Sequence, residues 1–162
     1  MNADAFRTLY DYHMAMNRKL WDTYILPLSQ DLFVQPVAYS VGSIRDQCVH
    51  LINADEVWFT GLRGLVPTPW RDPSDYADRD KIRAEWDAVE KQVRAYLAAL
   101  DDATLLTKPF AEDEDKDLMV WQVLLHVANH GTDHRAQILR LLHDVGVDTG
   151  PQDLIFHIYN KL

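Results

Sequence analysis

Three histidines recur at intervals of four residues within one segment of the sequence: His126, His130 and His134. This spacing places side chains on one face of an α-helix, where two successive imidazoles can bind the same metal ion. Structural zinc sites use four protein ligands and catalytic zinc sites use about three, so one helix cannot complete such a site. His50, in an upstream segment with helical periodicity, is the best candidate for a further imidazole. The pattern therefore predicts a site for one divalent metal ion.

The three clustered histidines cannot all point equally at one ion, because each four-residue step turns the side chain by about 40° around the helix axis. We favour the pair His130 and His134, since the segment NHGTDHRAQ surrounds it with polar residues that can support metal ligands. The residues around His126, LLHVA, are apolar. His126 is therefore predicted to be a core residue or to contact a ligand rather than the metal.

Four other side chains near the predicted site have alternative interpretations. His13 falls on the apolar stripe of the first predicted helix, and we interpret it as a hydrogen-bonded core histidine rather than a ligand. Asp55, Glu56 and Asp133 are carboxylates near the predicted ligands in the sequence. Any of them can orient a ligand or act as a base, and each is equally consistent with a solvated position on a helix.

Motifs for other chemistries are absent from the sequence. There is no HExxH motif of the zinc proteases, and no Glu-x-x-His pair of the ferritin-like di-iron proteins. The glycine-rich GxGxxG and GxxxxGK[ST] nucleotide motifs and the GxSxG motif of serine hydrolases are missing as well. A site with a single metal ion is the interpretation that remains.

The periodicity of apolar residues predicts four long helices that would position these histidines. They cover residues 4–25, a segment from Ile44, after the N-cap Ser43, to near Gly64, a segment from Ile82 to Leu100, and a segment from Trp121 to about His143. A long connection rich in turn residues separates the first two, and LLTKPFAEDEDKDLMV is expected to be an exposed loop or small hairpin. We predict an all-α four-helix bundle, a single domain over residues 1–162, with a long crossover between its first two helices and a short C-terminal helix.

Composition and charge exclude several classes of protein. A net charge of −9 argues against nucleic-acid binding, and no apolar run approaches the roughly 20 residues of a membrane-spanning helix. The N-terminal residues do not resemble a signal peptide, so a cytoplasmic location is expected. The single cysteine, Cys48, cannot form an internal disulfide or a cysteine-based zinc site, and is predicted to lie in the core.

The histidine-bearing segments resemble those of the DinB-like, YfiT-related family of metal-dependent four-helix-bundle proteins. SVGSIRDQCVHLINADEVWFTGL is similar to the family helix with the first histidine, WQVLLHVANHGTDHRAQILRLLHDVG to the helix with the His-x3-His pair, and PQDLIFHIY to the family's terminal segment. The resemblance spans nearly the whole chain. It implies that His50, His130 and His134 bind a divalent metal, usually zinc or nickel, with Arg135 and Gln137 in supporting positions.

The resemblance also implies a range of activities. Some members of this superfamily resemble transferases that join low-molecular-weight thiols such as bacillithiol to electrophiles, and others are mycothiol-dependent isomerases. We therefore expect a metal-dependent enzyme that transfers a small thiol to a small-molecule electrophile in stress or detoxification. A metal-dependent hydrolase, a non-enzymatic metal-stabilised stress-response module and a metal-free helical interaction protein are the alternatives. A homodimer is expected because family members often pair and the chain has five Trp and seven Tyr.

Overall fold

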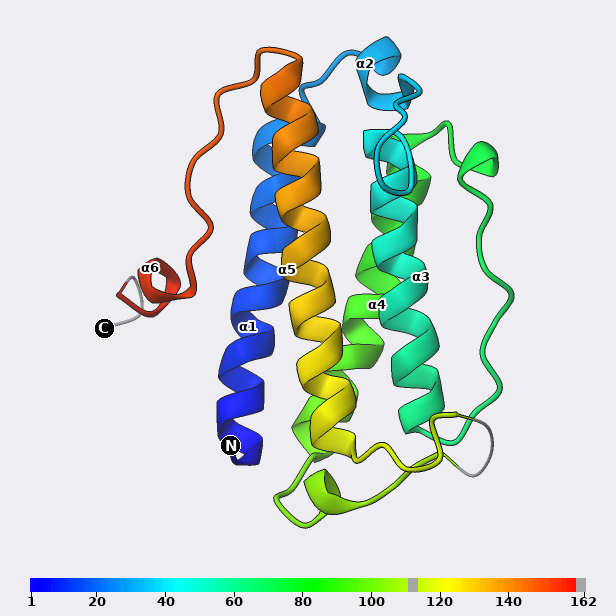
Figure 1. Cartoon of the computed structure of the whole chain (residues 1–162), viewed down its shortest axis with the longest axis vertical. Helices are drawn as coiled ribbons and strands as arrows, with labels where there is room; N and C mark the ends of the chain where they lie inside the picture. The colour runs from blue at the N-terminus through cyan, green and yellow to red at the C-terminus, as the bar shows by residue number, and fades with distance from the viewer. Residues whose placement is uncertain (111–113, 160–162) are drawn as a thin grey trace.

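The four segments with helical periodicity form four long helices that lie side by side in the computed structural model of the protein (Figure 1). Residues 1–110 and 114–159 are described. The long helices are α1 (Ala3–Leu20), α3 (Ile44–Leu62), α4 (Arg79–Ala99) and α5 (Val120–Asp144). The shorter elements are the π-helical turn η1 (Trp21–Ile25), the helices α2 (Gln30–Val34) and α6 (Leu154–Tyr159), and the 3-10 turns η2 (Pro73–Asp75) and η3 (Thr104–Leu106). The prediction of an all-α bundle is confirmed.

The packing of the long helices determines which segments can share a site. Helices α4 and α5 each contact both α1 and α3, so α1 and α3 occupy opposite corners of the bundle. The long connection predicted after the first helix joins these two corners and contains α2. A second long connection, residues 63–78, runs back along the outside of the bundle, so that α3 and α4 point in the same direction (Figure 1). Histidines on α3 and α5 can therefore face each other.

The start of α3 sets the position of His50, and it is held by a capping box. The Ser43 hydroxyl oxygen accepts a hydrogen bond from the Asp46 backbone N–H at 3.2 Å, and the Asp46 carboxylate accepts one from the Ser43 N–H at 2.9 Å. These two bonds satisfy backbone donors that the first helical turn leaves without partners. The predicted N-cap at Ser43 is confirmed.

Aromatic side chains fill the core between the helices. Trp21 packs edge-on against Trp86, with 5.9 Å between the ring centroids, and Phe59 packs in the same way against Tyr10 at 5.5 Å. Cys48 is fully buried among these apolar residues, as predicted, and burial raises the pKa of its thiol well above the usual value. The thiol is therefore part of the core and not a reactive group.

The segment between α4 and α5 was expected to be an exposed loop or a small hairpin. Its described residues form η3 and irregular chain without a strand, and the Val120 N–H donates a hydrogen bond to the Thr107 carbonyl at 3.0 Å. Residues 111–113, in the acidic run, lie outside the described residues. None of the described helices combines the length and the apolar character needed to cross a bilayer.

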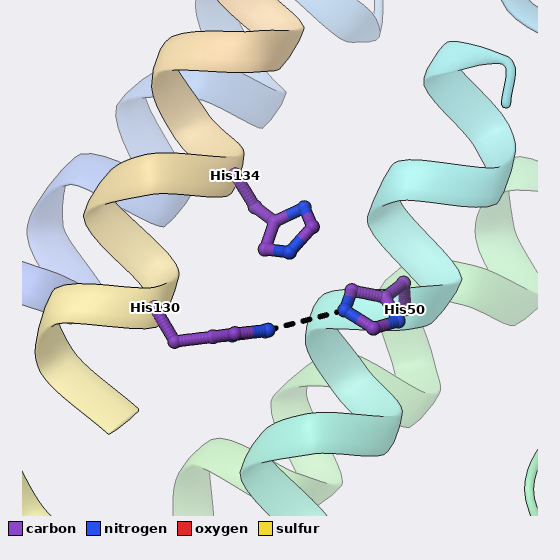
Figure 2. A group of neighbouring side chains, drawn as sticks. All are labelled: His50, His130 and His134. Carbon is purple, nitrogen blue, oxygen red and sulfur yellow. Dashed lines mark hydrogen bonds between the residues drawn. The ribbon is translucent and has the colours of Figure 1, made fainter. Parts of the chain in front are cut away.

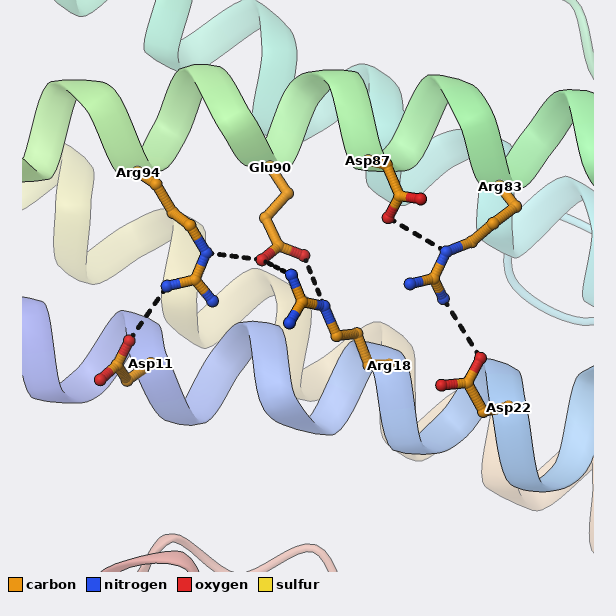
Figure 3. Close-up of polar contacts among 7 residues, drawn as sticks. All are labelled: Asp11, Arg18, Asp22, Arg83, Asp87, Glu90 and Arg94. Atoms are coloured by element: carbon orange, nitrogen blue, oxygen red, sulfur yellow. Dashed lines mark hydrogen bonds and ion pairs between the residues drawn. The ribbon is translucent and has the colours of Figure 1, made fainter.

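Ion pairs join α1 to α4 along the face away from the predicted site (Figure 3). Glu90 of α4, only 8% exposed, accepts hydrogen bonds from Arg18 of α1 and from Arg94, whose Nε lies 2.6 Å from the Glu90 carboxylate. Arg94 also reaches Asp11 of α1 at 3.2 Å. Removing the charge of a buried carboxylate with two arginine partners costs more free energy than removing it from an exposed pair, because water compensates less for the lost partner.

We predict that Glu90→Gln lowers the free energy of unfolding by about 1–2 kcal/mol, since the carboxylate that two arginines bind loses its charge while the half-exposed arginines remain hydrated. Urea denaturation followed by circular dichroism measures this change. The matched control is Asp87→Asn, which removes an exposed partner of Arg83 on the same helix. It is expected to cost less than about 0.5 kcal/mol. Equal losses in the two variants would contradict a special role for Glu90.

Candidate metal centre

Three of the predicted residues come together between α3 and α5. His50 projects from α3, and His130 and His134 project from α5 one helical turn apart, so that the three rings converge (Figure 2). One ring nitrogen of each histidine lies within 4.8 Å of the others. The Nε2 atoms of His50 and His130 are 3.1 Å apart. The spacing on one helix and a facing imidazole thus produce the arrangement that the sequence predicts.

The donor set fits a divalent transition metal. With zinc–nitrogen distances of about 2.0–2.1 Å, two ligand nitrogens in a tetrahedral site lie about 3.3–3.4 Å apart. The separation of 3.1 Å between His50 and His130 is close to this value. Among the described His, Cys, Asp and Glu residues, no fourth side chain joins the group. The three histidines could therefore hold a metal ion and leave part of its coordination to an exogenous ligand, as catalytic zinc sites do.

The electrostatics of the site favour neutral imidazoles. Burial, followed by the neighbouring His134 and His50, lowers the pKa of His130 to about 4. Burial and the neighbouring His134 also lower the pKa of His50. Burial lowers the pKa of His134 as well, although the Asp133 carboxylate acts in the opposite direction. Imidazoles with lowered pKa values keep their lone pairs at neutral pH, and the neutral ring is the form that binds a metal.

A chain of amides supports His134. Its Nδ1 lies 2.7 Å from the Gln47 side-chain oxygen, which can only accept, so Nδ1 carries the proton and Nε2 is free for a metal. Gln47 donates to the Gln137 oxygen at 3.1 Å, and Gln137 donates to the Asp133 carboxylate at 3.0 Å. Gln137 thus supports the site indirectly. The sequence did not single out Gln47, although it lies three residues before His50, because its role depends on how α3 faces α5.

The second ring nitrogen distinguishes His130 from His134. Metal-bound histidines commonly form a hydrogen bond through this nitrogen, and Nδ1 of His134 does so with Gln47. Nδ1 of His130 is buried without a hydrogen-bond partner in the part of the chain that the structure describes. A buried ring nitrogen without a partner is costly, so this atom calls for an explanation.

His126 lies outside the group of three. A core position for it is wrong, because it is exposed, but the alternative of contact with a ligand histidine is supported, since its ring lies 5.8 Å from that of His130 between centroids. Its ring also packs edge-on against Trp58, with 5.2 Å between centroids. An open hollow of about 500 Å³ lies along this side of α5. It is lined by His126, Asn129, His130, Thr132, Asp133 and Ala136. The hollow gives small molecules a route to His130.

His13 is a buried, hydrogen-bonded core histidine, as predicted. Its Nδ1 lies 3.0 Å from Nη1 of Arg135, and its Nε2 lies 3.5 Å from the Asp55 carboxylate. Arg135 is 1% exposed and also donates to the Asn17 side-chain oxygen at 3.0 Å. Arg135 therefore supports His13 and not one of the three convergent histidines directly.

Glu56 anchors the connection between α3 and α4, residues 63–78. Its carboxylate accepts hydrogen bonds from Arg71 at 2.5 Å and from Thr68 at 2.7 Å. Burial alone would raise the pKa of Glu56, but these hydrogen bonds and the Arg71 charge lower it below its usual value. Trp70, next to Arg71, lies over His50 with 5.6 Å between the ring centroids. Glu56 thus acts on the site by anchoring the segment that carries Trp70.

Two comparisons with known proteins match the chain over nearly its whole length. The model of the DinB family matches residues 1–161 of the chain. The chain is also similar to Protein DinB of Bacillus subtilis strain 168, with 24% identity over 170 residues that cover 98% of this chain and 96% of that protein.

We predict that purified protein binds one divalent metal ion per chain, and that His130→Ala abolishes this stoichiometric binding because it removes one of three ligands. His126→Ala, a change of the same size one turn away on α5, is expected to leave most of the metal in place. Elemental analysis after dialysis against trace metal measures both variants. Loss of metal in His126→Ala with retention in His130→Ala would show that the other histidine pair is the ligand pair.

Proposed function

The chain belongs to the DinB family, and we propose that it is a metal-dependent enzyme that transfers a low-molecular-weight thiol to a small electrophile in stress or detoxification. The observation that carries this proposal is the set of three convergent histidines without a fourth protein ligand among the described residues. A site that only stabilised the fold would be expected to use four protein ligands. An incomplete set beside an open hollow favours binding of a small molecule.

The metal ion would be held by His50, His130 and His134, with zinc or nickel as the leading candidates. Three neutral imidazoles leave the ion its full positive charge, which lowers the pKa of a bound thiol or water. The remaining tasks fall to the protein. His126 and Asp133 line the hollow beside His130, and either side chain can accept the proton that a thiol loses. In the transfer, the S–H bond breaks, a bond forms between sulfur and the electrophilic carbon, and the displaced group leaves with the proton.

We also propose that the protein is a homodimer. The short helix α6 lies beside α1 at the edge of the bundle (Figure 1) and leaves large apolar side chains exposed, among them Ile155 at 45% and Phe156 at 48%. Exposed apolar side chains that cluster on one element favour contact with another protein surface.

For the homodimer we expect sedimentation at micromolar concentration to give twice the chain mass of 18.8 kDa. Phe156→Ser should shift the equilibrium towards monomer, because it removes apolar area from the α6 surface. The control is Val66→Ser, which changes a side chain that is 91% exposed on the connection after α3. It should leave the mass unchanged. A single 18.8 kDa species in the unmodified protein would end the proposal.

For the transferase activity we expect zinc- or nickel-loaded protein to conjugate at least one of bacillithiol, mycothiol, glutathione and cysteine to a chromogenic alkylating electrophile. The rate should exceed that of the metal-free protein about tenfold or more, since each unit by which the thiol pKa falls towards neutrality raises the thiolate fraction about tenfold. His134→Ala is the inactive control. If a spectroscopically intact site accelerates no thiol, the transferase is replaced by a metal-dependent hydrolase or a binding module.

A further inference from the structure

Three buried polar atoms around the contact of α5 with α1 and α3 have no hydrogen-bond partner among the residues that are described. They are Nδ1 of His130, Oδ1 of Asp55 and Nε of Arg135, whose other guanidinium nitrogens are hydrogen-bonded. The first becomes a donor if His130 uses Nε2, the atom that faces His50, to bind a metal. The second is an acceptor on a carboxylate that is only 6% exposed. His130 thus presents a buried donor without an acceptor, and Asp55 presents a buried acceptor without a donor.

Asp55 acts electrostatically on His130. Burial, His134 and His50 lower the pKa of His130, and Asp55 is the carboxylate that opposes this shift. The other two carboxylates near the site are committed elsewhere. Glu56 accepts hydrogen bonds from Arg71 and Thr68, and Asp133 accepts one from Gln137. Asp55 is therefore the carboxylate whose free oxygen is available to His130.

The other oxygen of Asp55, Oδ2, already has a partner on α1. Nε2 of His13 lies 3.5 Å from this oxygen and 3.3 Å from the side-chain nitrogen of Asn17. Arg135 can only donate, and it holds His13 from the other side, with 3.0 Å between its Nη1 and Nδ1 of His13. The contact with His13 therefore involves Oδ2, and Oδ1 has no partner among the described residues.

Gly131 shows that His13 lies close against α5 next to His130. A Cβ atom at position 131 would come within 2.2 Å of Cε1 of His13, so only glycine permits this approach. The imidazole of His13 therefore lies against the backbone of the residue that follows His130. This contact brings the Asp55 cluster to the α5 turn that carries the metal-facing imidazole.

From these contacts we infer that Asp55 is a positioning residue for the metal centre, whose Oδ1 accepts the Nδ1–H of His130, directly or through one buried water, when the site is loaded. Gln47 performs the same task for His134 with a neutral amide. The carboxylate raises the basicity of its imidazole and orients the ring, as the outer partners of metal-bound histidines commonly do. The inference rests on the proposed metal site at His50, His130 and His134.

The wild-type protein loaded with zinc gives the first test. Long-range proton–nitrogen correlation spectra should show His130 bound through Nε2, with its Nδ1 proton downfield and slow to exchange. The Nδ1 proton of His134, which Gln47 binds, serves as an internal reference in the same spectrum. In Asp55→Asn the His130 proton should move upfield and exchange faster, whereas the His134 proton should stay in place. General loosening of the core would move both signals.

Competition with a zinc chelator gives the second test. Asp55→Asn is expected to weaken zinc binding about 10–100-fold, and Asp55→Ala more, because the amide keeps an acceptor oxygen without the charge. Asp144→Asn, the matched control at an exposed carboxylate of α5 that pairs with Arg140, should bind zinc as the wild type does. If the variants at Asp55 do not fold, the wild-type spectrum decides.

The outcomes separate this inference from the proposed function. If the wild type binds zinc through the three histidines but the His130 Nδ1 proton exchanges rapidly, and Asp55→Asn binds zinc normally, the role of Asp55 is overturned and the metal site stands. If the wild type binds no zinc or other divalent metal, the metal site falls and the role of Asp55 falls with it.

Discussion

The contact between α3 and α5 is the constraint on which the site depends. His130 and His134 share a face of α5 by their spacing alone, but a third imidazole must come from a helix that lies against that face. The capping box at Ser43 defines where α3 begins, and Gln47 links α3 to His134 across the interface. A change in the rotation of α3 would turn His50 away from the other two rings. The helix start and the interhelical hydrogen bond therefore maintain the same geometry.

This geometry places polar groups where an ordinary bundle has apolar ones. Three imidazoles, Asp55, His13 and Arg135 all lie inside or at the edge of the core, and burying such groups costs free energy unless they find partners. Most of them do, through the hydrogen bonds of Gln47, Asn17 and Arg135. The aromatic packing around Trp21 and Phe59, together with the ion pairs between α1 and α4, stabilises the rest of the fold. The buried polar side chains of the site are thus concentrated between α1, α3 and α5.

The long connection after α3 extends the site beyond the helices. Arg71 forms ion pairs with Glu56 of α3 at 2.5 Å and Glu85 of α4 at 2.7 Å, and it hydrogen-bonds to Asn53 through its backbone as well. These contacts hold an otherwise irregular segment against the bundle and place Trp70 over His50. One side of the histidine group is therefore bordered by an aromatic ring and the other opens beside His130 to the hollow along α5.

The sequence by itself determined the helices and the pair His130 and His134, because both follow from local periodicity. Apolar spacing defined the four long segments, Ser43 marked the start of one of them, and the four-residue interval paired His130 with His134. The tertiary structure decided what depends on neighbours distant in sequence. It turned His126 to the surface, committed Glu56 to Arg71, and brought Gln47 to His134 and Asp55 to His13. Periodicity reports which face of a helix is apolar, but the partner of each polar side chain is set by the packing of other helices against it.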